Sequence, residues 1–197
     1  MCKSYDDAMK PAAFCSPNQG VSDGYVVANG TLLGSDCDCF CCFNKPSFIT
    51  INGTQTRIDL LNKGDKPPAG LLLDSLSAGP HLLSTDDKGV TDIAIPWDDM
   101  NIANVLEHAS NTAVALREST QSALFVTVDG NDGCSKATCG VNSYQLAYLL
   151  KDFLHATSGM NMDQGGSTTM FVQGAGIVTN PGGDARKVGN GLFLVRA

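Results

Sequence analysis

The sequence contains little charge, and most of that charge is of one sign. Only 17% of its 197 residues are Asp, Glu, Lys or Arg, and 13 basic residues against 20 acidic ones give a formal net charge of −7. A protein that binds the nucleic-acid backbone needs a basic face, and anionic membrane surfaces attract basic segments. The charge balance therefore argues against nucleic acid and against anionic membranes as partners.

Long apolar runs, internal repeats and low-complexity tracts are also missing. No apolar run approaches the 18 residues that a membrane-spanning helix needs, so no membrane span is expected. Residues 1–7 lack the apolar stretch of a secretory signal peptide, and no signal peptide is visible. Hydrophobic residues still make up 43% of the chain, enough for a folded core. We expect a single domain over 1–197, in which residues 1–20 form a loosely ordered or truncated N-terminal segment.

Histidine is scarce, and none of its three copies has a metal-binding partner three or four residues away. They are His81, His108 and His155. We expect no histidine metal ligand and no cofactor. The segment that holds Asp129 and Asp132 is similar to a calcium loop, but Gly140 takes the place of the final glutamate of an EF-hand. A non-standard cation site on these two aspartates remains an alternative.

Cysteine, in contrast, is abundant, with eight residues. An even number of cysteines and two glycosylation sequons, at Asn29 and Asn52, are typical of an oxidising, extracytoplasmic compartment. The cysteine cluster over 37–42 lacks the paired spacing of zinc ribbons. We therefore expect a secreted or otherwise extracytoplasmic glycoprotein with disulfide bonds, in which Cys134 and Cys139 are placed to close a small loop. Free thiols and a metal cluster remain as alternatives.

Two Asn-Gly pairs lie between β-rich runs, which is the strongest short-range signal for a β-hairpin. They predict hairpins over 24–33 and 47–60. A short helix is expected over about 96–107, beginning at Pro96. Further strands are expected over 112–116, 123–128, 170–173, 176–179 and 192–195. Glycine-containing turns separate several of these strands.

The clearest helix is predicted over about 142–155. Its apolar side chains recur at helical spacing, at Leu146, Leu149, Leu150, Phe153 and Leu154. Asn142 followed by Gln145 is the pattern of a capping box, and Gly159 can end the segment. We expect this helix to pack and not to carry chemistry. The elements together predict an α+β fold: a mixed, mostly antiparallel sheet core, one long packed helix and several β-hairpins.

One stretch combines an acid, glycines and hydroxyl side chains. It runs Asp163, Gln164, Gly165, Gly166, Ser167, Thr168. Glycines let the backbone approach a ligand closely, and their amides can point at an anion. The stretch lacks the Gly-x-Ser-x-Gly pattern that would make Ser167 a hydrolase nucleophile. Two interpretations fit this composition: a tight turn whose hydroxyl groups satisfy its own backbone, or an anion-binding turn with Asp163 at its mouth.

The order of these segments resembles the phosphodiester glycosidase family. The segments that carry the resemblance are the glycine signature at 161–170, a strand ending in Asp-Gly at 124–130, the helix at 142–153 and a closing segment at 180–192. In the closing segment, Arg186 and Asn190 stand where the family has an arginine and an asparagine. The resemblance extends over about residues 110–197, and more faintly over 20–60.

This resemblance implies a hydrolase that cleaves the glycosidic bond of a sugar-1-phosphodiester, with a phosphosugar or glycan as substrate. Such cleavage passes through an oxocarbenium-like state, so it needs a carboxylate near the sugar C1 and donors for the phosphate oxygens. Asp163 and Asp129 are the candidate catalytic carboxylates. The candidates for substrate and phosphate binding are Gly165, Gly166, Ser167, Thr168, Arg186 and Asn190. The sequence makes no prediction of oligomeric state.

The sequence departs from the family pattern in three places. Gln164 replaces the first glycine of the signature, Asn111 stands where the family usually has arginine, and the segment Pro11–Cys15 lacks the family's asparagine. Asparagine cannot replace an arginine that binds phosphate through two hydrogen bonds. These departures support an alternative function: a non-catalytic relative that acts as an extracellular carbohydrate-binding or structural, self-assembling domain.

Overall fold

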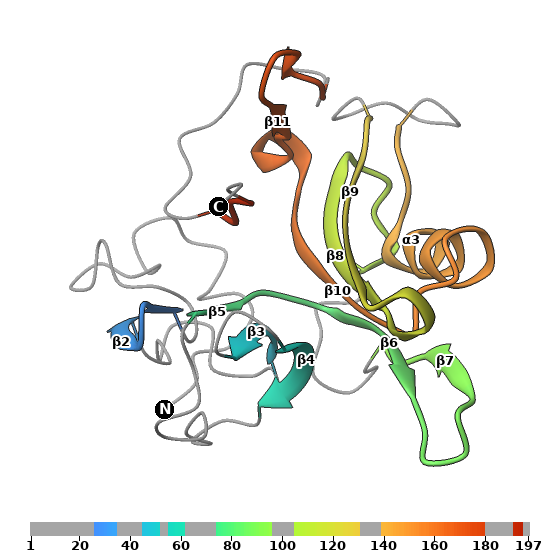
Figure 1. The fold of residues 1–197 in the computed structure, drawn as a ribbon. Helices are drawn as coiled ribbons and strands as arrows, with labels where there is room; N and C mark the ends of the chain where they lie inside the picture. Colours follow the sequence, from blue (N-terminus) through green and yellow to red (C-terminus); the bar gives the residue numbers. More distant parts are fainter. Residues whose placement is uncertain are drawn as a thin grey trace, which may run out of the picture.

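The computed structural model describes residues 26–34, 45–51, 55–61, 74–95, 105–130, 139–179 and 191–194. Its strands form two five-stranded antiparallel sheets and a two-stranded ribbon (Figure 1). Sheet A has the order β2-β1-β5-β3-β4. Its strands are β1 (Val26–Ala28), β2 (Thr31–Gly34), β3 (Lys45–Ile51), β4 (Gln55–Leu61) and β5 (Asp74–Ser77).

Sheet B has the order β7-β6-β10-β8-β9 and positions the candidate site. Its strands are β6 (His81–Thr85), β7 (Thr91–Ile93), β8 (Asn111–Arg117), β9 (Ser122–Val128) and β10 (Ser158–Gln164). A short 3-10 turn, η3 (Glu118–Thr120), joins β8 to β9. The ribbon consists of β11 (Phe171–Val172) and β12 (Gly176–Ile177). The mostly antiparallel sheet core predicted from the sequence is confirmed.

Both predicted hairpins are confirmed. Asn29 and Gly30 connect β1 to β2 with φ angles of 48° and 74°, so both adopt the left-handed conformation that a type I′ turn requires. In the second hairpin, seven residues of β3 pair in register with β4, from Lys45 opposite Leu61 to Ile51 opposite Gln55. The Asn-Gly signal therefore located both turns within the correct pair of strands.

The predicted helix is present but shorter than expected, so the prediction of one long helix over 142–155 is wrong in its length. It consists of α3 (Ser143–Tyr148) and one π-helical turn, η4 (Leu149–Phe153). The capping box is confirmed, because Asn142 Oδ1 accepts from Gln145 N at 2.9 Å and Gln145 Oε1 accepts from Asn142 N at 3.0 Å.

The helix ends early because its C-terminus is bound by a neighbouring strand. Arg117 of β8 donates from Nε and Nη2 to the Leu154 carbonyl, at 2.9 and 2.6 Å. The next residue, His155, has a φ of 52°, which takes the chain out of the helix. Gly159 therefore does not end the helix but lies within β10. A Cβ at this position would come within 3.2 Å of Leu150 Cδ1, so the glycine lets the helix pack closely on the strand.

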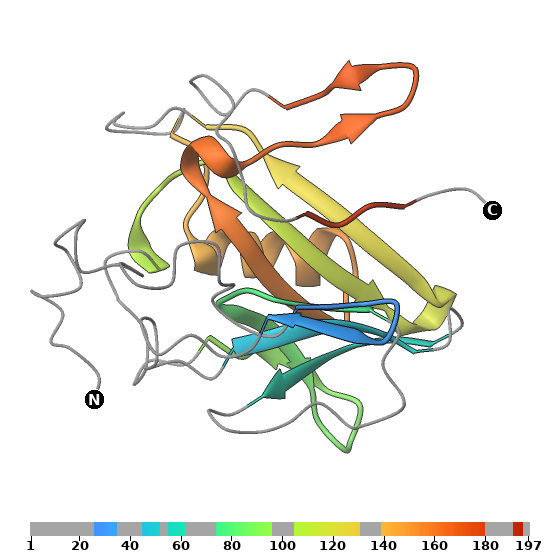
Figure 2. The same cartoon turned by 90° about the vertical axis from the view of Figure 1, so that its left-hand side faces the viewer.

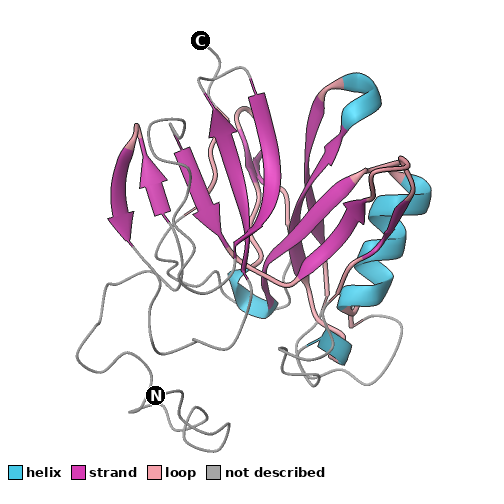
Figure 3. Ribbon diagram, turned by 90° about the horizontal axis from the view of Figure 1, so that it is seen from below, coloured by secondary structure: helices cyan, strands magenta, loops and turns pink. Residues whose placement is uncertain are grey.

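Sheet B forms the middle of three layers, with α3 on one face and sheet A on the other (Figures 2 and 3). Side chains along β8 alternate between these layers. Ala113 and Ala115 contact the helix core around Leu146 and Leu150, and both leucines are fully buried. Each such leucine contributes about 1.5–3 kcal/mol. On the sheet A side the core consists of Val114, Leu116 and Met160, with Ile58, Ala78, Phe125, Met162 and Leu192 packed against it.

The segment 191–194 contains no strand, so the strand predicted over 192–195 is wrong where the structure describes it. Leu192 instead packs against the Val114, Leu116 and Met160 cluster, on the sheet A side of sheet B. Of the helix predicted over 96–107, residues 96–104 lie outside the described residues. No helix in the described regions of the chain is both long and apolar enough to cross a membrane.

Several predictions from the sequence concern residues outside the described ranges, namely the N-terminal segment over 1–20, the cysteine cluster over 37–42, Asn52 and Cys134. Cys139 is buried and disulfide-bonded. Its pairing with Cys134 remains a prediction, as do glycosylation and an extracytoplasmic location.

Candidate functional site

Three strand ends meet at one end of sheet B. The pairing places Asp163 of β10 opposite Thr112 of β8, and Thr112 opposite Thr127 of β9. Val128 is the last residue of β9, and Asp129 follows it directly. The two predicted carboxylates, Asp163 and Asp129, therefore lie at the same end of the sheet, on either side of β8.

A β-bulge determines which face of the sheet Asp163 occupies. The pairing passes from Asn161 opposite Ala113 to Asp163 opposite Thr112, so Met162 is an extra residue in β10. Side chains alternate between faces along a strand, so without this extra residue Asp163 would lie on the helix face together with Asn161. The bulge places Asp163 on the opposite face, beside Thr112. Bulges often redirect a side chain in this way next to a functional site.

This face of sheet B changes from apolar to polar along its length. Val114, Leu116 and Met160 are buried where sheet A covers the face. Beyond them the same face carries Thr112 and Asp163, and the strand ends extend past sheet A (Figures 1 and 2). Asp163 is exposed. The sheet therefore presents a polar end with two exposed aspartates and two half-buried threonines, which we call the polar end of sheet B and define by Thr112, Thr127, Asp129 and Asp163.

The predicted glycine turn follows Asp163 directly, as the 3-10 turn η5 (Gly165–Ser167). Ser110 makes two hydrogen bonds to this turn. Its carbonyl accepts from Gly165 N and its Oγ donates to the Gly165 carbonyl, both at 2.8 Å. The Gly165 carbonyl also accepts from Thr168 N at 3.0 Å. The amides of Gly165 and Thr168 are thus bonded within the protein. The candidate backbone donors for a ligand are the amides of Gly166, which is buried, and Ser167, which is half-buried.

Close backbone packing around residues 109, 130 and 140 leaves no room for a side chain at two glycines beside the strand ends. Gly140 has a φ of 85°, and a Cβ there would lie 2.0 Å from the Ala109 carbonyl oxygen. A Cβ at Gly130, the residue after Asp129, would lie 2.6 Å from the Cys139 carbonyl oxygen. Both positions require glycine, because the neighbouring atoms belong to the backbone and cannot rotate away. The segments around 109, 130 and 140 therefore form a rigid support for the site.

A buried amide network lies on the other face of the same strand ends. Asn111 Nδ2 donates to the carbonyls of Ala109 and Val141 at 3.1 and 2.8 Å, and its Oδ1 accepts from Asn161 Nδ2 at 2.9 Å. Asn111 is fully buried. Its side chain points away from Asp163 and binds the protein's own backbone, so it is a structural group of the bulged region.

The Asp163 carboxylate makes one local contact. Its Oδ1 accepts from the Gln164 amide at 2.8 Å, at the start of the glycine turn. In the described residues no group of three or more His, Cys, Asp or Glu side chains is arranged to hold a metal ion. Asp132, the second member of the alternative cation site, lies outside them.

The comparison with protein families decides the affiliation of the chain. The family model described as phosphodiester glycosidase matches residues 8–195. The chain belongs to the phosphodiester glycosidase family. A search of curated proteins found none that matches it.

For this phosphodiester glycosidase family member, the structure brings together several of the predicted site residues. Asp163, Asp129 and the glycine turn 165–168 lie at the same end of sheet B. Arg186 and Asn190 lie outside the described residues, so their roles remain predictions. The residue after Asn190 begins the segment 191–194, which reaches the same face of the sheet through Leu192.

Sequence reasoning missed Thr112 and Ser110. It assigned Thr112 to a buried strand and gave it no role in the site. The signal that could have located both is a polar stretch, Ser110 to Thr112, placed directly before the apolar residues of β8. Polar residues at the start of an otherwise apolar strand mark the strand end as a place where the core stops.

Proposed function

We propose that this chain hydrolyses the glycosidic bond of a sugar-1-phosphodiester at the polar end of sheet B. Membership of the phosphodiester glycosidase family supports the reaction class. The bulge in β10 supports this location of the site, because it places the exposed Asp163 beside Thr112 and directly before the glycine turn. A carboxylate next to the backbone amides of a glycine turn provides both kinds of group that this cleavage needs.

In the proposed reaction, water adds to the sugar C1 while the bond from C1 to the phosphate oxygen breaks. The phosphomonoester leaves as an anion, which is already a good leaving group. The Asp163 carboxylate stabilises the positive charge that develops on the sugar ring. The amides of Gly166 and Ser167 and the Ser167 hydroxyl bind the phosphate, with Arg186 and Asn190 as further donors. Thr168 supports this turn from within the protein, because its side chain is fully buried.

Asp129 is proposed as the second carboxylate, at a wide separation from Asp163. Asp163 and Thr127 lie on β10 and β9, two strand spacings apart with β8 between them, and Asp129 lies two residues beyond Thr127. This places the Cα atoms of Asp163 and Asp129 roughly 12 Å apart. Retaining glycosidases hold their two carboxyl groups about 5 Å apart, whereas inverting enzymes hold them roughly 6.5–9.5 Å apart with a water molecule between them. Side chains turned toward each other bring their carboxyl groups closer than these Cα atoms, nearer to the inverting range than to the retaining one, so we assign Asp129 as the base that activates a water molecule, with inversion at C1.

A second function is a carbohydrate-binding domain without catalysis. The observation that favours it is the contact from Gln164 N to Asp163 Oδ1, because it gives the carboxylate a structural role in its own turn. The departures at Gln164 and Asn111 point the same way, although the Asn111 side chain faces away from Asp163. In this function the polar end of sheet B binds a phosphosugar and releases it unchanged.

One experiment separates the two functions. An α-N-acetylglucosamine-1-phosphodiester is titrated into the protein in a calorimeter, and a matched sample is assayed for free sugar. Release of sugar together with an equal amount of phosphomonoester supports the hydrolase. Saturable binding without release contradicts it and supports the binding domain. The folded state of each sample is checked by circular dichroism.

A further inference from the structure

We infer that Thr112 is a sugar-binding residue, which contacts a hydroxyl group of the glycosyl moiety of the ligand. The inference rests on the proposed function, since it assigns one more residue to the same site. Nothing in the residue pattern of the glycine signature points to Thr112. Its assignment comes from three features of the structure: its position in the sheet, the state of its hydroxyl group and the charges beside it.

Thr112 occupies the middle of the polar end of sheet B. It lies on β8 between Asp163 of β10 and Thr127 of β9, and it is directly opposite both. Side chains that face each other across antiparallel strands have Cβ atoms about 4.5–5.5 Å apart. The Thr112 hydroxyl is therefore within reach of any group that also contacts the Asp163 carboxylate.

The Thr112 hydroxyl oxygen is buried and has no hydrogen-bond partner among the residues that the structure describes. Thr85, Thr91 and Thr157 of sheet B and its margin are paired, whereas the buried Thr168 hydroxyl in the glycine turn has no partner either. Thr85 Oγ1 donates to the Thr157 carbonyl at 2.6 Å and lies 2.7 Å from Thr91 Oγ1, and Thr157 Oγ1 donates to the Leu116 carbonyl at 3.2 Å. Proteins rarely leave a buried hydroxyl unpaired, so such a group calls for an explanation, and a functional role at a binding site is one.

The charges around Thr112 indicate which group of the ligand it contacts. The exposed Asp163 carboxylate lies directly opposite it, and a single hydroxyl group does little to offset the repulsion of an anionic phosphate oxygen there, whereas the glycine turn offers backbone amides. A sugar hydroxyl is neutral and can donate to one oxygen while accepting from another. The phosphate group is then bound at the glycine turn, and the sugar ring lies over Thr112.

The test uses two variants at this position and one matched control. Thr112→Val removes the hydroxyl and keeps the shape, and Thr112→Ser keeps the hydroxyl. Thr56→Val makes the same change on β4 of sheet A, outside the site. For each protein the inhibition constants of the free sugar and of the phosphomonoester are measured, together with kcat, KM and the midpoint of urea unfolding.

We expect Thr112→Val to weaken binding of the free sugar about 10-fold or more, because one hydrogen bond to the ligand is lost. Binding of the phosphomonoester should change less than about twofold, and the unfolding midpoint should stay equal or rise. Thr112→Ser should bind the sugar within about threefold of wild type, and Thr56→Val should bind like wild type. A role limited to folding would lower the midpoint and leave both inhibition constants unchanged.

Three results overturn the inference. They are unchanged sugar binding by Thr112→Val, equal weakening of sugar and phosphomonoester, and a fall in the unfolding midpoint with no change in binding. A wild-type protein that binds the sugar without cleaving the diester refutes the proposed hydrolysis alone, because the sugar-binding comparison can still be made by calorimetry. A wild-type protein that binds neither product refutes both proposals.

Discussion

Replacement of Asn111 by alanine tests whether the buried amide network holds the bulged end of β10 in place. Asn111 Nδ2 donates two hydrogen bonds, to Ala109 and Val141, and Oδ1 accepts a third from Asn161. At about 1 kcal/mol of net stability each, the three bonds contribute about 3 kcal/mol. The substitution also leaves Asn161 Nδ2 buried without this acceptor, which costs a further 1–3 kcal/mol or so.

The expected loss for Asn111→Ala is therefore about 4–6 kcal/mol of the free energy of unfolding. This is a large share of the roughly 5–15 kcal/mol typical of a folded domain. Asn142→Ala is the matched control, because Asn142 is a half-buried cap of α3 and its loss should cost about 1 kcal/mol. Both variants are measured by equilibrium urea unfolding, followed by circular dichroism.

A double variant, Asn111→Ala with Asn161→Ala, provides a second check. Removing both side chains eliminates the orphaned donor, so the double variant should be at least 1 kcal/mol or so more stable than the sum of the two single losses predicts. If Asn111→Ala is no more destabilising than Asn142→Ala, the network does not hold the strand ends, and the reasoning about the bulge is refuted.

Three other measurements test further features of the structure. Gly140→Ala should prevent folding, because its Cβ would lie 2.0 Å from a backbone oxygen. Gly89→Ala is its control: the φ of Gly89 is a similar 81° but the space around it is open, so the change should cost only about 1–2 kcal/mol. The soluble yield and the urea unfolding of the two variants are compared. Burial lowers the pKa of His81, so its contribution to the free energy of unfolding should be complete above about pH 6.5 and be lost as the pH falls through the folded-state pKa. His81→Gln should therefore flatten the dependence of the free energy of unfolding on pH in that range. The same slope in His81→Gln and in the wild type would contradict the assignment. NMR of the first product should show inversion at C1, and retention would exclude the water-mediated role of Asp129.

The elements of the fold that were predictable have strong local causes. Asn29-Gly30 fixes a hairpin because both residues tolerate a positive φ. Asn142 and Gln145 define the helix start through two reciprocal hydrogen bonds. β8 and β9 were located because their residues are apolar and β-branched over several positions. In each case the determining interaction lies within a few residues of sequence.

The central strand β10 was not predicted, because its stability comes from its neighbours. Its sequence, Ser158 to Gln164, contains a glycine and four polar residues and no β-branched side chain. It forms a strand because β6 and β8 pair with it on both sides and Gly159 fits under Leu150. Packing in the tertiary structure overrides such weak local propensity.

The candidate site was predictable in its acids and glycines but not in its geometry. The proximity of Asp163 and Asp129 follows from the pairing of β8 with two strands far apart in sequence. The bulge at Met162, which selects the face of Asp163, has no signature in a single sequence. The same holds for Thr112, whose importance depends on which residue lies opposite it.

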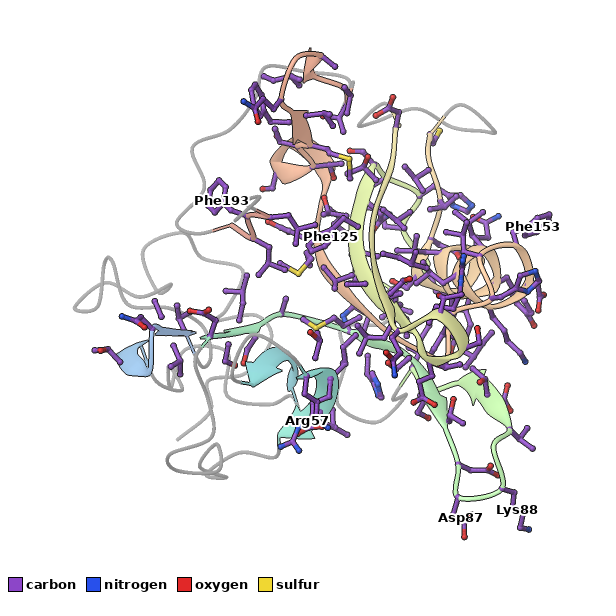
Figure 4. The ribbon with its side chains drawn as sticks, in the orientation of Figure 1. Arg57, Asp87, Lys88, Phe125, Phe153 and Phe193 are labelled. Atoms are coloured by element: carbon purple, nitrogen blue, oxygen red, sulfur yellow. The ribbon has the colours of Figure 1, made fainter. Side chains whose placement is uncertain are left out.

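The measurement that tests the central claim most directly is the rate of sugar release by Asp163→Asn. Asp87→Asn is its matched control, because it removes the same charge from an exposed acid in the hairpin between β6 and β7, well away from the strand ends (Figure 4). We expect Asp163→Asn to lower kcat/KM about 1,000-fold or more while the fold is retained, and Asp87→Asn to behave like wild type. Equal rates for the two variants would contradict the assignment of the polar end of sheet B as the catalytic site.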